Sequence, residues 1–125
     1  MTDAVKDLIG DYDTFCETLL QHPLMTAIAW EHIALSHLCV RTEAYDDYHR
    51  ILDTLVPLSA CWSEHEHNGR PIAVVLLRED LVLSCAVQFQ TIPCIELTAP
   101  KDGVTYKTGL EHIGARTCVS FFQGT

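Results

Sequence analysis

The spacing of apolar residues along the chain predicts two helices. Hydrophobic side chains recur every three or four positions from residue 3 to residue 21, which predicts one helix over 3–21. Thr42 precedes a second stripe of this kind and fits an N-cap, so a second helix is predicted over 43–55, closed by Pro57. The residues that this second helix would bury are Tyr45, Tyr48, Ile51, Leu52 and Leu55.

Alternation of apolar and polar residues predicts strands in the rest of the chain. Over residues 31–40 the alternation places His32 on one face of a strand and Ile33 on the other. Asn68-Gly69 is the strongest turn signal in the chain and predicts a hairpin between two strands. A later apolar run contains Pro93, which either divides the run into two strands or confines it to a sheet edge.

The order of these elements indicates an α+β fold. A leading helix is followed by a strand, a helix, two or three antiparallel strands and the start of another strand. Elements in this order build a curved sheet with helices packed on one face. We therefore expect the opposite face of the sheet to carry polar side chains.

The triplet Glu-His-Ile occurs twice, at 31–33 and 111–113, each time at the start of a predicted strand. Because each isoleucine would face the helices, His32 and His112 would project from the opposite face, and Glu96 has the same parity. Two imidazoles and a carboxylate with vacant positions suit Fe(II), Mn(II), Zn(II) or Ni(II). The alternative is that each histidine is a satisfied polar group at a strand end, with Glu96 a solvated partner.

Composition narrows the class of protein. The chain has 125 residues, 48% hydrophobic and 20% charged, which is typical of one globular domain. Its net charge of −9 and its eight scattered Lys and Arg residues argue against nucleic acid and anionic membranes as partners. The acidic start and the lack of a long apolar run predict a cytoplasmic protein. The six cysteines show no CxxC spacing and are expected to be buried, reduced thiols.

Two other groups of residues suggest chemistry of their own. Cys61, His65 and His67 would share one side of the predicted hairpin, which suits a local zinc site, although a polar hairpin tip explains the same residues. Cys94 would be a nucleophile only if its thiol ionised, which a carboxylate two residues away disfavours. His37 is expected on the helix-packed face of the first strand, as a structural or solvated residue.

Three stretches resemble the YecM family of bacterial proteins: the His-Ile pair at 32–33, NGRPI at 68–72 and IPCIELTAPKDGVTYKTGLEHI at 92–113. That family is placed in the vicinal oxygen chelate, or glyoxalase-like, superfamily, whose βαβββ units pair around a divalent metal ion. The resemblance implies a helical extension over 1–30, one βαβββ unit over 31–110 and the first strand of a second unit over 111–125.

The resemblance also implies a metal site and a reaction class. The implied ligands of a Zn, Ni, Mn or Fe ion are His32, Glu96 and His112, with Gln88, Gln90 or a partner chain completing the shell. The implied chemistry is isomerase, lyase or oxygenase action on a small oxygenated molecule, with Glu96 as ligand or base. Because the resemblance implies a second unit that this sequence does not complete, three alternatives remain: a truncated or frame-shifted gene product, a homodimer in which a second copy completes the site, or a degenerate, non-catalytic relative.

Overall fold

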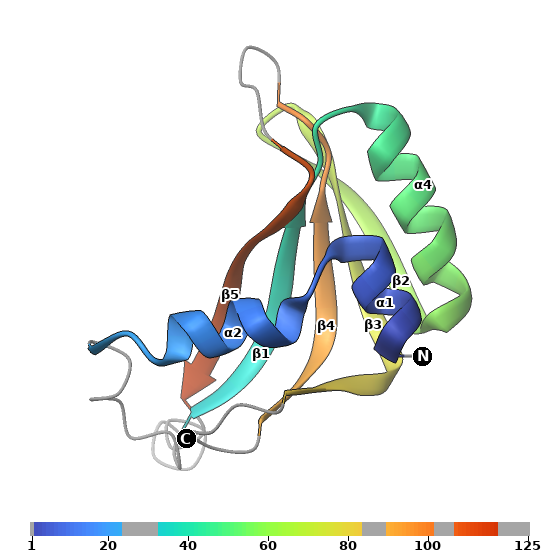
Figure 1. The fold of residues 1–125 in the computed structure, drawn as a ribbon. Helices are drawn as coiled ribbons and strands as arrows, with labels where there is room; N and C mark the ends of the chain where they lie inside the picture. The colour runs from blue at the N-terminus through green and yellow to red at the C-terminus, as the bar shows by residue number, and fades with distance from the viewer. Residues whose placement is uncertain (1, 24–32, 84–89, 102–106, 118–125) are drawn as a thin grey trace, which may run out of the picture.

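A curved five-stranded sheet forms the framework of the protein, with helices on one of its faces (Figure 1). The computed structural model describes residues 2–23, 33–83, 90–101 and 107–117. In chain order the elements are α1 (Thr2–Ile9), α2 (Tyr12–Leu20), β1 (Ile33–Arg41), α4 (Tyr45–Leu55), the 3-10 helix η2 (Val56–Leu58), β2 (Ser59–His67), β3 (Arg70–Leu83), β4 (Gln90–Thr98) and β5 (Gly109–Thr117).

The strands lie in the order β2-β3-β4-β1-β5. Strands β1 and β4 are parallel, while the other neighbouring pairs are antiparallel, so the sheet is mixed. The chain runs from β1 through α4 into the meander β2-β3-β4, which gives the order β-α-β-β-β, and β5 then pairs with the other side of β1. The predicted α+β class with a curved mixed sheet is confirmed.

The helical segment predicted over 3–21 is confirmed, but Gly10 divides it into two helices, α1 and α2. Gly10 adopts a φ of 107°, a conformation that favours glycine, and its N–H donates to the Lys6 carbonyl at 2.9 Å. Asp11 then caps α2, since its carboxylate accepts a hydrogen bond from the Thr14 N–H at 3.1 Å. The apolar stripe continues across this break and is buried in both helices.

The helix predicted over 43–55 forms as α4, but Thr42 is not its N-cap. Ala44 precedes the first turn and provides no side-chain cap, while the buried Thr42 hydroxyl donates to the Thr98 carbonyl at 2.8 Å. Thr42 thus links the end of β1 to β4. Of the predicted stripe, Tyr48, Ile51, Leu52 and Leu55 are buried and Tyr45 is exposed.

The hairpin predicted at Asn68-Gly69 is confirmed. These two residues have φ values of 53° and 79°, and a two-residue type I′ turn needs positive φ at both positions. Pro93 lies within β4, between β3 and β1, so it neither divides the strand nor marks an edge. The strand tolerates this proline because the β3 register shifts opposite it and pairing with β1 begins only at Cys94.

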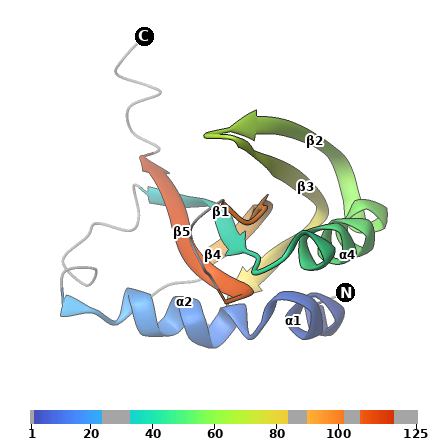
Figure 2. The same ribbon diagram turned by 90° about the horizontal axis from the view of Figure 1, so that it is seen from above.

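The helices and one face of the sheet enclose an apolar core. Its largest fully buried side chains include Tyr12, Leu38, Tyr48, Ile51 and Ile95. Figure 2 shows α1, α2 and α4 on the convex side of the sheet, and no described helix covers the concave side. None of the described helices is long and apolar enough to span a membrane.

Candidate metal centre

A row of polar side chains crosses β4, β1 and β5 on the concave face. The strand register pairs Cys39 of β1 both with Glu96 of β4 and with His112 of β5. Directly paired residues of neighbouring strands point to the same face. Ile95 and Leu97, on either side of Glu96, are fully buried in the core, so Glu96 points away from the helices. Glu96 and His112 therefore flank Cys39 on the concave face.

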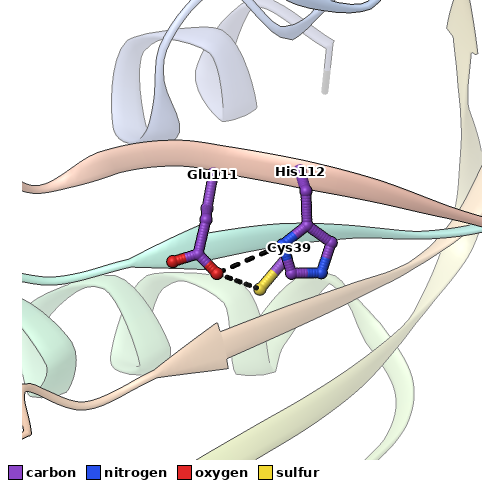
Figure 3. A group of neighbouring side chains, drawn as sticks. All are labelled: Cys39, Glu111 and His112. Carbon is purple, nitrogen blue, oxygen red and sulfur yellow. Dashed lines mark hydrogen bonds and ion pairs between the residues drawn. The ribbon is translucent and has the colours of Figure 1, made fainter.

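A β-bulge adds Glu111 to this row. Cys39 pairs with His112 and the next residue, Val40, pairs with Leu110, so Glu111 is the extra residue in β5. Its carboxylate consequently lies on the same side as the His112 ring, with Oε1 3.1 Å from Nδ1. The same oxygen accepts a hydrogen bond from the Cys39 thiol at 3.8 Å (Figure 3). Ligand atoms of these three residues all lie within 4.8 Å of one another.

A second bulge, at Ser36 in β1, brings His37 to the concave face. Leu35 and Leu38 are both buried although they are three residues apart, so Ser36 is the extra residue there. His37 Nε2 lies 3.9 Å from Glu96 Oε2, and the His37 and His112 ring centroids are 6.1 Å apart. The prediction that His37 packs on the helix side is therefore wrong, because the bulge reverses the parity on which it rested.

Gly114 provides the space for the His37 ring. The register pairs His37 with Gly114 across β1 and β5. A Cβ atom at position 114 would lie 2.1 Å from His37 Cε1 and 2.6 Å from Nδ1, far inside van der Waals contact. The ring thus rests against the backbone of β5, and only glycine at this position allows the arrangement seen.

Burial and negative charge keep the thiols of the site protonated. Desolvation, together with the Glu111 and Glu96 carboxylates, raises the pKa of the Cys39 thiol to about 12. Desolvation and Glu96 also raise the pKa of the Cys94 thiol. Neither sulfur is therefore an activated nucleophile at neutral pH, which for Cys94 agrees with the argument from sequence. Arg41 places a positive charge beside Glu111, with its Nη1 4.0 Å from Glu111 Oε2.

The structure places two of the three predicted ligands together and adds three residues that the sequence argument missed. Glu96 and His112 share the concave face, whereas His32 and Gln88 lie outside the described residues. The missed residues are His37, Cys39 and Glu111. A signal for both bulges exists in the sequence: Leu35 and Leu38, and likewise Leu110 and Ile113, are apolar pairs three residues apart in strands of period two.

The residues of the alternative zinc site lie on the exposed side of the hairpin and are not among the clustered ligand atoms of the described residues. The register places Cys61, His65 and, at the strand end, His67 on one side of β2, as alternation predicted. All three are exposed, and β2 contributes no residue to the one group of metal-ligating side chains found in the described part of the chain. Among the described thiols, Cys16 and Cys39 are buried, Cys94 is half-buried and Cys61 is exposed, so the prediction of buried cysteines is wrong for Cys61. Cys85 and Cys118 lie outside the described residues.

Comparison with known proteins gives one family. The family model described as YecM protein matches residues 4–121 and therefore covers nearly the whole sequence, including every strand of the sheet and each residue of the cluster on the concave face. Neither the search of curated proteins nor the search of solved structures finds a match.

Proposed function

The chain belongs to the YecM family, and we propose from this that it binds one divalent metal ion on the concave face of its sheet, through His37, Glu96 and His112. The observation that carries the proposal is the convergence of side chains from three strands. Imidazole and carboxylate groups are distant in the sequence, yet His37 lies 3.9 Å from Glu96 and its ring centroid 6.1 Å from that of His112.

The residues present fit such an ion. Two imidazoles and a carboxylate suit zinc, nickel, manganese or iron, and leave coordination positions for a substrate. His37 and Glu96 are about one-third exposed and His112 about half exposed, so an ion has access from the open side of the sheet. Gly114 supports the proposal, because the lack of a Cβ atom at this position leaves the space that the His37 ring occupies.

The chemistry that follows is of the glyoxalase type. A bound divalent ion is a Lewis acid that would polarise a carbonyl or enediolate oxygen of a small oxygenated substrate. Glu96 would serve as ligand or as the base that holds the proton removed from that substrate. On this basis we propose isomerase, lyase or oxygenase chemistry.

The direct test is to titrate the whole protein with a divalent metal ion, to measure binding by calorimetry, and to measure the bound metal by elemental analysis. About one equivalent of tightly held divalent ion is expected, with affinity lost in His37→Ala and His112→Ala. His49→Ala is the matched control, because His49 is exposed on α4, on the other side of the sheet, where its ring contacts Tyr48. A protein that binds no ion, or binds it equally well without these imidazoles, would contradict the proposal.

His32→Ala decides between the ligand predicted from sequence and the one proposed from the structure. If His37 is the ligand of β1, His32→Ala keeps the wild-type metal affinity and His37→Ala loses it. The reverse result would restore His32, Glu96 and His112 as the ligand set.

We propose as a second candidate that the protein acts as a homodimer whose two concave faces meet. Leu76 supports this, since it is a large apolar side chain on the concave side, paired with Cys94, and yet 41% exposed. Light scattering would show a dimer that Leu76→Asp converts to a monomer. Tyr45→Asp, at a site 44% exposed on α4, is the control that should remain dimeric. A monomeric wild-type protein at all concentrations would exclude this arrangement.

A further inference from the structure

Cys39 occupies the centre of the polar row and is otherwise unexplained. It is 1% exposed, and the strand register places it between Glu96 on one side and His112 on the other. If position 39 had only a packing role, a small apolar side chain would serve there and no sulfur atom would lie beside the carboxylates. The thiol instead donates its hydrogen bond to Glu111, whose oxygen also contacts His112.

The spacing of these three side chains is that of atoms sharing one metal ion. Zinc bonds of about 2.0 Å to nitrogen and oxygen and about 2.3 Å to sulfur, at tetrahedral angles, place the oxygen roughly 3.3 Å from the nitrogen and 3.5 Å from the sulfur. The corresponding distances here are 3.1 Å between Glu111 Oε1 and His112 Nδ1, and 3.8 Å between Glu111 Oε1 and Cys39 Sγ. Little rearrangement is needed for one ion to contact all three residues (Figure 3).

We propose that Cys39 supplies a thiolate ligand to the ion at this centre, and that this sulfur makes the protein select a thiophilic ion, zinc in the first place, over manganese or magnesium. The inference rests on the proposed metal site, with which it shares His112, and names Cys39 and Glu111 as further ligands of that ion. Soft sulfur ligands favour zinc, whereas magnesium and manganese prefer oxygen.

The binding step balances by release of one proton. A bond forms between Cys39 Sγ and the metal ion as the S–H bond that donates to Glu111 Oε1 breaks, and the proton passes to solvent, because Glu111 Oε1 itself contacts the ion. No oxidation or reduction is involved. Cys94 differs, although it faces the same side of the sheet, because its thiol contacts the Ile95 carbonyl and takes no part in the ligand cluster.

Cobalt(II) is the probe, because a thiolate ligand gives it a sulfur-to-metal charge-transfer absorption that oxygen and nitrogen ligands do not. The reduced full-length protein titrated with cobalt should develop this absorption, and Cys94→Ser should keep it. Cys39→Ser should lose it while the visible bands of bound cobalt persist. In competition experiments the zinc affinity of Cys39→Ser should fall roughly 10- to 100-fold, with a smaller change for manganese.

The outcomes separate this inference from the metal site itself. If neither the wild type nor any variant binds cobalt, the proposed metal site itself is refuted. Binding without charge transfer in the wild type, or with unchanged charge transfer in Cys39→Ser, would leave the site intact and refute the thiolate. If Cys39→Ser does not fold, X-ray absorption of the zinc-loaded wild type gives the answer. A sulfur neighbour at about 2.3 Å is expected there, and its absence overturns the inference.

Discussion

Gly114→Ala should displace the His37 ring and weaken metal binding without unfolding the protein. The added Cβ would lie 2.1 Å from His37 Cε1, whereas carbon atoms in contact are about 3.5 Å apart, so the ring must move by roughly 1.5 Å. Metal ligands tolerate displacements of only about 0.2 Å, so the displaced imidazole no longer reaches the ion. Gly114 does not have a positive φ, and alanine therefore fits the backbone.

The expected loss follows from the cost of disturbing a ligand. Changes in residues that merely orient a ligand cost about 10- to 100-fold in metal affinity, so displacement of His37 should cost at least as much. At saturating zinc this removes about 1.4 to 2.7 kcal/mol of ligand-induced stabilisation, which appears as a smaller metal-dependent rise in melting temperature. The metal-free variant should stay within about 1 kcal/mol of wild type, since the 30%-exposed His37 side chain can turn into solvent.

A double-mutant cycle tests whether the effect acts through His37. In the His37→Ala background the ring is gone, so Gly114→Ala should change metal affinity by less than about twofold, within the additivity error of about 0.5 kcal/mol. Wild-type metal stabilisation in Gly114→Ala, or an equal loss in both backgrounds, would show that the close approach of ring and backbone has no role in binding.

Four further expectations test other features of the structure. Tyr48 is buried and donates a 2.5 Å hydrogen bond to Glu64, so Tyr48→Phe should lower the free energy of unfolding by about 1 to 2 kcal/mol in urea titrations, and an unchanged value would contradict this. Burial and this bond raise the Tyr48 pKa above its ordinary 10.0, so the folded state holds the proton more tightly and wild-type stability should decline as pH rises beyond about 10, less so in Tyr48→Phe. Alkylation at neutral pH followed by peptide mapping should modify Cys61, which is exposed, well before Cys39, and the opposite order would refute the burial described. Deletion of Glu111 removes the extra residue of the β5 bulge and should leave a folded protein by circular dichroism, whereas global unfolding would show that the bulge is needed for folding.

Features set by local chemistry were predictable from the sequence, and those set by strand irregularity were not. Asn68-Gly69 specifies its own turn, and the apolar neighbours of Glu96 fix its face, so both predictions hold. The helix break at Gly10 was open to prediction, because a Gly-Asp pair can end one helix and cap the next. Thr42 illustrates the limit: the residue type suits a cap, but a carbonyl on a strand distant in sequence takes its hydroxyl.

The site residues depended on a feature that strict alternation cannot represent. A regular strand presents every second residue to one face, so a single error in parity moves all later side chains to the wrong side. The bulge at Ser36 produced that error for His37, and the bulge before His112 concealed Glu111. Apolar pairs three residues apart mark both positions, and a search for that spacing would have placed His37 correctly.

The two bulges share a pattern that connects strand geometry with the chemistry of the site. In each case the extra residue lies directly before a histidine and contacts its Nδ1 atom: Ser36 Oγ lies 2.9 Å from that of His37, and Glu111 Oε1 lies 3.1 Å from that of His112. In the metal-free protein, contacts of this kind fix the plane of each imidazole. A regular strand would send the residue before each histidine to the opposite face, where it could not reach the ring. The bulges in β1 and β5 therefore supply, within the same two strands, both the imidazoles and the groups that orient them.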